Sequence, residues 1–170
     1  QLDAERYEMV SLGEEVVAPY SRPDAQGQPM FELPGKLGRP LPYLAYAQGA
    51  YLGQMVELIL KRCSAPVHFD RVYETDMAEG LKAMALEGHG VAFLPFSAVQ
   101  KDLRAKRLVS AAPPELRGLQ ITMEVRVYRQ RVLHRESYKP AASSQTGESG
   151  KRSALALWDF LLAQGRASLG

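Results

Sequence analysis

Two short stretches of the sequence can present backbone groups to a small ligand. Gln48-Gly49-Ala50-Tyr51 and Thr75-Asp76-Met77 each precede apolar residues at helical spacing. The first-turn amides of a helix have no partner within the helix and lie at the positive end of its dipole, where small anions bind readily. Thr75 and Asp76 also have a simpler role, because their side-chain oxygens can cap the helix. The Asp76 carboxylate also disfavours an anion at that end.

Catalytic and metal chemistry find little support in the sequence. It contains no G-x-S-x-G, Walker A or G-x-G-x-x-G motif, and no nucleophile with a recognisable base. His68, His89 and His134 lie far apart, without a second histidine or a carboxylate at ligand spacing. We therefore expect no catalytic residue, no metal site and no cofactor, and we interpret His89 as a turn residue that tolerates an unusual backbone angle.

Two sulfur-containing residues have alternative interpretations. Cys63 is the single cysteine, so an internal disulfide is excluded. We expect it to pack in the core, since a redox thiol needs an exposed, electropositive setting. Met77 is either ordinary core filler or a ligand-facing thioether that an oxidant converts to the polar sulfoxide.

The composition is that of a globular domain. The 170 residues are 46% hydrophobic and 24% charged, and the formal net charge is +2, too small to indicate nucleic-acid binding. No run is long enough to span a bilayer, and the start, QLDAERYEMV, lacks the basic and apolar regions of an export signal. We therefore expect a cytoplasmic protein that does not contact membranes.

The elements that position these residues are clearest in the middle of the chain. Gly88-His89-Gly90 ends one apolar helical stripe and leads into a short buried run. The expected elements are a strand at 68–73, a helix capped by Thr75 or Asp76, the turn at 88–90, a strand at 91–94 closed by Pro95, and a helix from Ser97 to about Lys106. This order predicts an α/β unit, and a strand at 41–46 with a helix after Gly49 predicts a second one.

The two ends of the chain read differently. Residues 7–12 and 15–20 predict two short strands joined by a turn at Gly13, and residues 119–128 alternate as a strand with one wet face. Residues 136–152 are polar and rich in Ser and Gly, which predicts a disordered loop. A final helix, capped by Ser153, has an apolar face that we expect to pack firmly; its members are Leu155, Leu157, Trp158, Leu161 and Leu162.

The central stretch ETDMAEGLKAMALEGHGVAFLPFSAVQKDLRAKRLV resembles a segment of the LysR-type transcriptional regulators. The resemblance implies an α/β, type II periplasmic-binding-protein-like fold. It places residues 20–117 in the complete second lobe, 1–19 in the closing part of the first lobe, and 118–170 in the return to that first lobe, with a hinge at 18–22. It lacks the helix-turn-helix, the linker helix and the start of the first lobe, so we expect that the chain is a fragment or that another chain covers its open sheet edge.

The resemblance also implies a function and a set of contacts. The chain would be the effector-sensing domain of a bacterial regulator, binding a small-molecule effector, or sensing an oxidant, between the lobes. DNA would be bound only through the missing N-terminal domain, and the protein would be a homodimer or homotetramer. For the subunit contact we expect the exposed side of the helix at 51–62 together with the sheet edge of the second lobe; the alternative is that this is an ordinary amphipathic surface helix. The implied effector contacts are Gln48, Gly49, Tyr51, Thr75, Met77 and Phe93. The alternatives are a solute-binding protein of the same fold and an enzyme whose catalytic residues we cannot identify.

Overall fold

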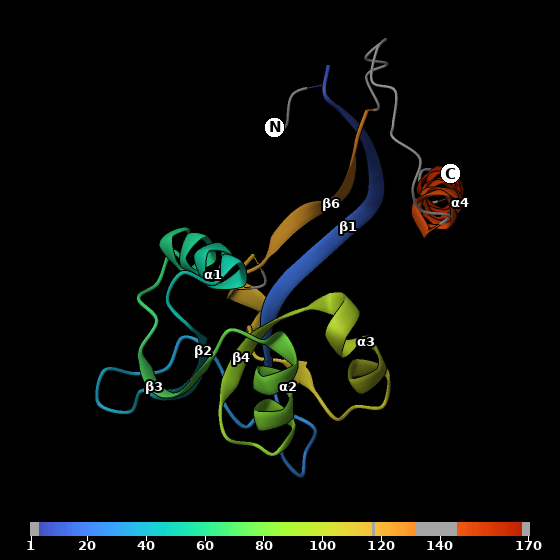
Figure 1. The fold of residues 1–170 in the computed structure, drawn as a ribbon. Helices are drawn as coiled ribbons and strands as arrows, with labels where there is room; N and C mark the ends of the chain where they lie inside the picture. The colour runs from blue at the N-terminus through green and yellow to red at the C-terminus, as the bar shows by residue number, and fades with distance from the viewer. Residues whose placement is uncertain (1–3, 117, 132–145, 168–170) are drawn as a thin grey trace. The chain divides into compact units, whose positions relative to one another are not determined.

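The computed structural model describes residues 4–116, 118–131 and 146–167, and the side chains of the last segment only within 153–163 (Figure 1). The chain divides into two compact units, Glu15–Met123 and residues 1–14 with 124–170. These bounds lie a few residues outside the lobe limits expected from the sequence, 20 and 117. Each unit is described below by itself.

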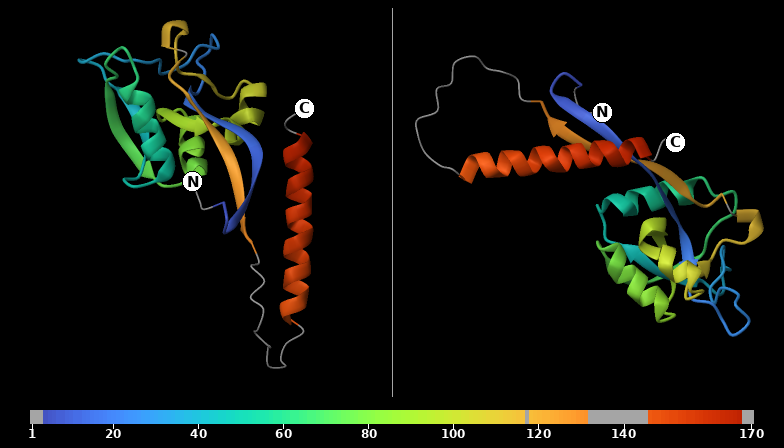
Figure 2. Two further views of the ribbon diagram at one scale, coloured as in Figure 1. Left: turned by 90° about the horizontal axis from the view of Figure 1, so that it is seen from above. Right: turned by 90° about the vertical axis from the view of Figure 1, so that its right-hand side faces the viewer.

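The unit Glu15–Met123 is an α/β structure built on a mixed sheet, as predicted (Figure 2). Its strands are the C-terminal part of β1 (Tyr7–Ser21), with β2 (Leu41–Tyr46), β3 (Phe69–Thr75), β4 (Val91–Pro95) and β5 (Val109–Ser110), in the order β3-β2-β4-β1-β5. Its helices are α1 (Tyr51–Lys61), α2 (Ala78–Leu86), α3 (Phe96–Arg104) and a 3-10 turn at Pro114–Leu116. Strand β2 runs parallel to β3 and β4, whereas β1 runs antiparallel to β4 and β5.

The core of this unit forms around β4. Its residues Val91, Ala92, Phe93 and Leu94 are fully buried, as expected for a central strand covered on both faces. Leu81 and Ala85 of α2, which belong to the stripe predicted from the sequence, are fully buried as well. The buried faces of the sheet and of the helix therefore form one hydrophobic core.

Two glycines make the junction between α2 and β4 possible. The Gly88 amide donates to the Ala85 carbonyl (3.0 Å) and the His89 amide to that of Met84 (3.1 Å), so the helix ends in a Schellman motif. The left-handed residue is Gly88, with φ +82°, and not His89 as predicted. At Gly90 a Cβ would lie 2.5 Å from the Pro42 carbonyl oxygen, so only glycine permits this approach of the turn to β2.

The prediction of a turn at Gly13 is wrong. Strand β1 is continuous over Tyr7–Ser21, and Gly13 lies within it at φ +120°. The strand continues because its first half pairs with β6 (Ile121–Gln130), a partner that cannot be seen from the local sequence. At the far end of this ribbon the Arg131 amide donates to the Arg6 carbonyl (2.8 Å), and Glu8 pairs with Arg129.

The unit of residues 1–14 and 124–170 contains the first half of β1, most of β6 and the helix α4 (Thr146–Ala167). The helix begins before Ser153, so residues 146–152 of the expected loop are helical, while residues 136–145 lie outside the described part of the chain. The prediction of a firmly packed apolar face is also wrong. Trp158 is buried with the Arg129 guanidinium 4.6 Å from its ring centroid, but Leu155 and Leu157 are more than half exposed.

Candidate ligand-binding cavity

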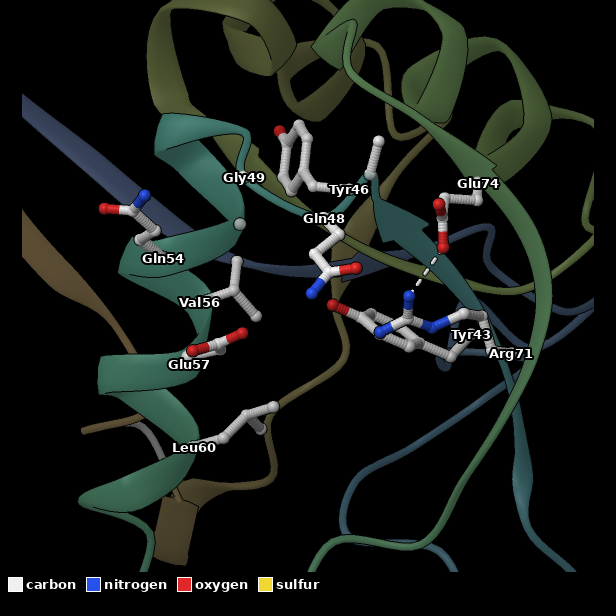
Figure 3. A pocket seen from close by; sticks show the side chains of 12 residues that line it. Tyr43, Tyr46, Gln48, Gly49, Gln54, Val56, Glu57, Leu60, Arg71 and Glu74 are labelled. Atoms are coloured by element: carbon white, nitrogen blue, oxygen red, sulfur yellow. Dashed lines mark hydrogen bonds and ion pairs between the residues drawn. The ribbon is translucent and has the colours of Figure 1, made fainter.

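A cavity of about 330 Å³ lies within the unit Glu15–Met123, between the ends of β2 and β3 and one side of α1 (Figure 3). Its wall comes from four consecutive pieces of this strand–helix–strand unit. The main lining residues are Tyr43 and Tyr46 of β2, Gln48 and Gly49 of the connecting loop, Gln54, Val56, Glu57 and Leu60 of α1, and Arg71 and Glu74 of β3.

Local backbone features bring these pieces together. In the parallel pairing of β2 with β3, Tyr43 lies opposite Arg71, and an irregularity in register follows between Tyr43 and Leu44. Gly49 turns the chain at φ +86°, and α1 then begins without a side-chain cap on its N-terminus. A Cβ on Gly53 would lie only 3.1 Å from the Tyr46 Cβ, so glycine lets the first turn of α1 approach β2 closely.

Two buried tyrosines line the cavity from β2. The Tyr43 ring stacks on Phe69 with centroids 4.4 Å apart and meets the Phe93 ring edge-on. Burial raises the pKa of Tyr43 to about 12, with a smaller decrease from Arg71 and a smaller increase from Glu57. Burial likewise raises the pKa of Tyr46 above its ordinary value. Both phenols are therefore neutral hydroxyl groups at physiological pH.

The Tyr46 hydroxyl has no hydrogen-bond partner within the described part of the chain, although the residue is only 4% exposed. Leaving a buried donor or acceptor unpaired costs about 1–3 kcal/mol. Such groups are rare in folded proteins and call for an explanation. The hydroxyl is sealed from solvent and points away from Gln48 and Tyr43, so a molecule in the cavity does not reach it (Figure 3).

Three charged side chains belong to the cavity wall. The Arg71 Nη1 lies 2.6 Å from the Glu74 Oε2, so these two residues, three positions apart on β3, form an ion pair. Glu57 forms no ion pair with any residue that the structure describes, and its carboxylate points from α1 toward Gln48 and Tyr43 (Figure 3).

The structure places the residues expected from the resemblance in three settings. Gln48 and Gly49 line the cavity. Tyr51 and Met77 are 64% and 63% exposed and lie outside its wall. Phe93 is fully buried in the core, where its ring contacts those of Tyr43 and Phe69 edge-on.

Thr75 does not cap α2. The N-cap position is Met77, which makes no side-chain capping hydrogen bond, so the prediction of a cap at Thr75 or Asp76 is wrong. The Met77 amide instead donates to the Thr75 Oγ1 at 3.4 Å, which closes a short turn before the helix. Thr75 is the last residue of β3 and pairs with Tyr46, so the strand ends two residues later than predicted and begins one residue later.

The sequence interpretation missed the charged and aromatic part of the wall, namely Tyr43, Glu57, Arg71 and Glu74. One signal was present: Tyr43 is on a predicted strand directly before the helix-start loop, and the two strands of such a unit lie side by side. The register of β2 against β3, which places Arg71 opposite Tyr43, depends on tertiary packing and on the irregularity after Tyr43.

Three further features considered in the sequence are the single cysteine, metal binding and membrane spans. Cys63 is half-buried and packs against the core. Across the described residues, no group of three His, Cys, Asp or Glu side chains could hold a metal ion. Within the same residues, no helix has both the length and the apolar character needed to cross a membrane.

Comparison with known families and relatives gives a consistent set of likenesses. The family model of the LysR substrate binding domain matches residues 3–139. QseD of Escherichia coli O157:H7, an HTH domain-truncated transcriptional regulator, is 31% identical over 110 residues, which are 65% of this chain and 44% of QseD. The HTH-type transcriptional regulator YjiE of Escherichia coli K12 is 32% identical over 111 residues, 65% of this chain and 35% of YjiE. The matched region is thus less than half of either relative.

Solved structures extend the likeness to three dimensions. The regulatory domain of HypT from Salmonella typhimurium, in its apo form, has a TM-score of 0.68 at 25% identity, over 92% of this chain and 66% of that one. DarR from Vibrio fischeri, solved in complex with DNA, has a TM-score of 0.68 at 22% identity, over 92% of this chain and 45% of that one. The latter identity supports a shared fold alone.

Proposed function

Because this chain belongs to the LysR substrate-binding domain family, we propose that it is the effector-sensing domain of a transcriptional regulator and that the cavity between β2, α1 and β3 is its ligand site. The observation that carries the proposal is a cavity of about 330 Å³ in which the Tyr43 hydroxyl lies beside the Gln48 amide, with the charged side chains of Glu57, Arg71 and Glu74 in the same wall (Figure 3). Small-molecule sites combine an apolar pocket with a few placed polar groups, and their volumes begin near this size, at about 300 Å³.

A ligand in this cavity acts on transcription only if it binds one conformation of the regulator more tightly than another. DNA would be contacted by a helix-turn-helix domain, and subunit association would transmit the change to it. Both the DNA partner and the homodimeric or homotetrameric assembly are part of this proposal. The names of QseD and YjiE, both transcriptional regulators, support it.

A thermal-shift screen of this chain against small metabolites tests the ligand site. A compound present at 100 times its Kd stabilises the folded state by about 2.7 kcal/mol. For a compound bound in the cavity, Gln48→Ala is expected to reduce the shift, because its amide lies in the wall. Thr75→Ala is the control, since Thr75 lies outside that wall. Hits whose shifts survive Gln48→Ala and Tyr43→Phe unchanged would place the ligand elsewhere.

One observation favours oxidant sensing as a second candidate. Met77 is 63% exposed at the N-terminus of α2, so its thioether is accessible to hypochlorite and is not core filler. Hypochlorous acid transfers its oxygen to the thioether, giving the sulfoxide, chloride and a proton. HypT of Salmonella typhimurium, which is 25% identical, is a hypochlorite-specific regulator.

Peptide mass spectrometry after a titration with hypochlorite tests this second candidate. Met77 is expected to gain one oxygen atom before Met84, which packs partly buried against the core. The Met77→Leu variant serves as the control for any structural change that follows oxidation. Equal oxidation of all methionines, or no structural response in the native chain, would argue against a sensing role.

A further inference from the structure

The charges of the cavity wall indicate what kind of molecule it takes. Resting on the function proposed above, we propose that the cavity selects a small organic cation, one that carries an ammonium, amidinium or guanidinium group. The juxtaposition that carries this proposal is an unpaired Glu57 carboxylate facing the hydroxyl and amide groups of Tyr43 and Gln48, while the one arginine of the wall is already paired.

The wall carries an excess of negative charge. Glu57 and Glu74 contribute two negative charges and Arg71 one positive charge, which leaves a net charge of −1. The ion pair between Arg71 and Glu74, at 2.6 Å, also occupies the guanidinium that would otherwise bind an anionic ligand. The uncompensated group is therefore the Glu57 carboxylate.

The N-terminus of α1 acts in the opposite direction but with a smaller charge. Its first turn has no acidic residue and no side-chain cap, so its dipole end is not neutralised. A helix dipole corresponds to about +0.5 elementary charge at its N-terminus, so it offsets only about half of the Glu57 charge. The electrostatic balance still favours a cation over an anion of the same shape.

The neutral polar groups of the wall fit a donor-rich ligand. The Tyr43 hydroxyl lies beside the Gln48 amide in the cavity and can accept a hydrogen bond (Figure 3). The side-chain carbonyls of Gln48 and Gln54 are further acceptors in the wall. Ammonium and amidinium groups carry several N–H donors and no acceptor, so they can satisfy the carboxylate and these oxygens together.

Benzamidine, benzamide and benzoate provide a matched test, because they have nearly the same shape and carry a positive charge, no charge and a negative charge. Butylammonium, butanamide and butyrate repeat the comparison on an aliphatic skeleton. Binding of each compound to the intact chain is measured by NMR titration, with the amides of the loop 47–50 and of α1 as reporters. We expect at least one cation to bind roughly three- to tenfold more tightly than its neutral and anionic counterparts.

Glu57→Gln is expected to remove this preference for the cation. Asp70→Asn is the control, because it also removes one carboxylate but at an exposed position of β3 outside the cavity wall. This control variant should keep the preference. Unchanged amide spectra away from residue 57 confirm that the Gln variant is folded. The assignment of a cation would be overturned if the cationic, neutral and anionic compounds bind equally, if the anion binds best, or if the preference for the cation survives Glu57→Gln. Each of these results would still leave a ligand site in place. If neither cation perturbs the cavity but metabolites from the thermal-shift screen do, the class is wrong. If no compound of either set perturbs it, the proposed ligand site fails as well.

Discussion

The Tyr46 hydroxyl is a single polar group whose burial opposes the stability of the fold. It is buried without a partner among the described residues, so it contributes an unfavourable free energy to the folded chain. Its ring, in contrast, is part of the hydrophobic core. Stability alone would be served at least as well by phenylalanine.

We therefore expect Tyr46→Phe to leave the free energy of unfolding unchanged or to raise it by about 1 kcal/mol. Urea denaturation followed by circular dichroism measures this. Tyr46→Leu is the companion variant, because it removes the ring and should cost at least 1 kcal/mol by loss of packing. A destabilisation of more than 1 kcal/mol by the Phe substitution would show that the hydroxyl has a partner after all.

The neighbouring phenol predicts how stability depends on alkaline pH. The pKa of Tyr43 is raised from 10.0 to about 12, so the folded chain holds this proton more tightly than the unfolded chain does. The resulting stabilisation is complete below pH 10 and is lost as the pH rises toward 12, in total about 2.7 kcal/mol at 1.36 kcal/mol per unit. The pKa values of Tyr20 and Tyr46 are raised as well, mainly by burial.

Urea midpoints between pH 9 and 12 check this, together with the tyrosinate absorbance at 295 nm. Tyr43→Phe should show a shallower loss of stability over this range than the native chain. A native chain whose stability is flat up to pH 12 would contradict the raised pKa values.

Single residues of the site were partly predictable from the sequence. Gln48 and Gly49 follow a predicted strand and precede a predicted helix, and such a loop lies at a sheet edge, where the structure places it in a cavity wall. Phe93 could not be assigned to a side of its strand, because every residue of a fully buried run is apolar. Glu57 and Arg71 became site residues only through the packing of α1 and β3 around β2.

At the scale of elements, the ends of α2 and α3 show the same backbone motif made from different residues. The Arg107 amide donates to the Asp102 carbonyl (2.9 Å) and the Lys106 amide to that of Leu103 (3.1 Å), so α3 also ends in a Schellman motif. The left-handed position is Lys106, with φ +53°, where α2 has Gly88. A left-handed conformation costs a residue other than glycine about 1–2 kcal/mol.

Lys106→Gly removes the cost of the left-handed conformation but increases the conformational entropy of the unfolded chain, which offsets part of this gain. The net expected effect is a rise in the free energy of unfolding of about 0.5–1 kcal/mol. Gly88→Ala is the converse change and should lower it by about 1 kcal/mol or more, since its Cβ would also approach Arg22 within 3.3 Å. Differential scanning calorimetry of both variants measures the pair. Two changes of the same sign would refute this account of the helix ends.

Helices and strands were predictable where neighbouring residues determine their bounds, and not where these bounds depend on packing with a segment distant in the sequence. The stop of α2 at Gly88 and the buried run of β4 agree with the structure because glycine and an apolar run act through their own backbone and burial. The turn at Gly13 was wrong because pairing with β6 outweighs the preference of glycine for turns. The start of α4 was wrong because Ser and Gly at 146–152 read as loop residues although they continue a helix.

At the scale of the whole molecule, the two units differ in how much core they contain. Nearly all of the buried apolar residues belong to Glu15–Met123. In the other unit, the described residues include few buried side chains, among them Val10 and Trp158. An isolated two-stranded ribbon is only marginally stable in water, so the second unit depends on few contacts of its own.

Native-state hydrogen exchange should reproduce this difference. The amides of β2 and β4 are expected to exchange slowest, at the free energy of global unfolding, while those of β1 before Gly13 and of β6 after Met123 exchange faster through local opening. Equal protection of Val10 and Phe93 would mean that the chain unfolds as one cooperative body.

The close approach at Gly90 has a consequence for how the specificity of this domain can be altered. The ligand preference of the cavity can be changed by substitutions at Gln54 or Glu57, whose side chains are exposed in its wall. Gly90 is not among the residues that line the cavity, yet a methyl group there would press on the Pro42 carbonyl and push the Tyr43 segment away from β4. In a library of variants selected for binding new effectors, we therefore expect different residues at the positions of the cavity wall but glycine at position 90 in every selected variant.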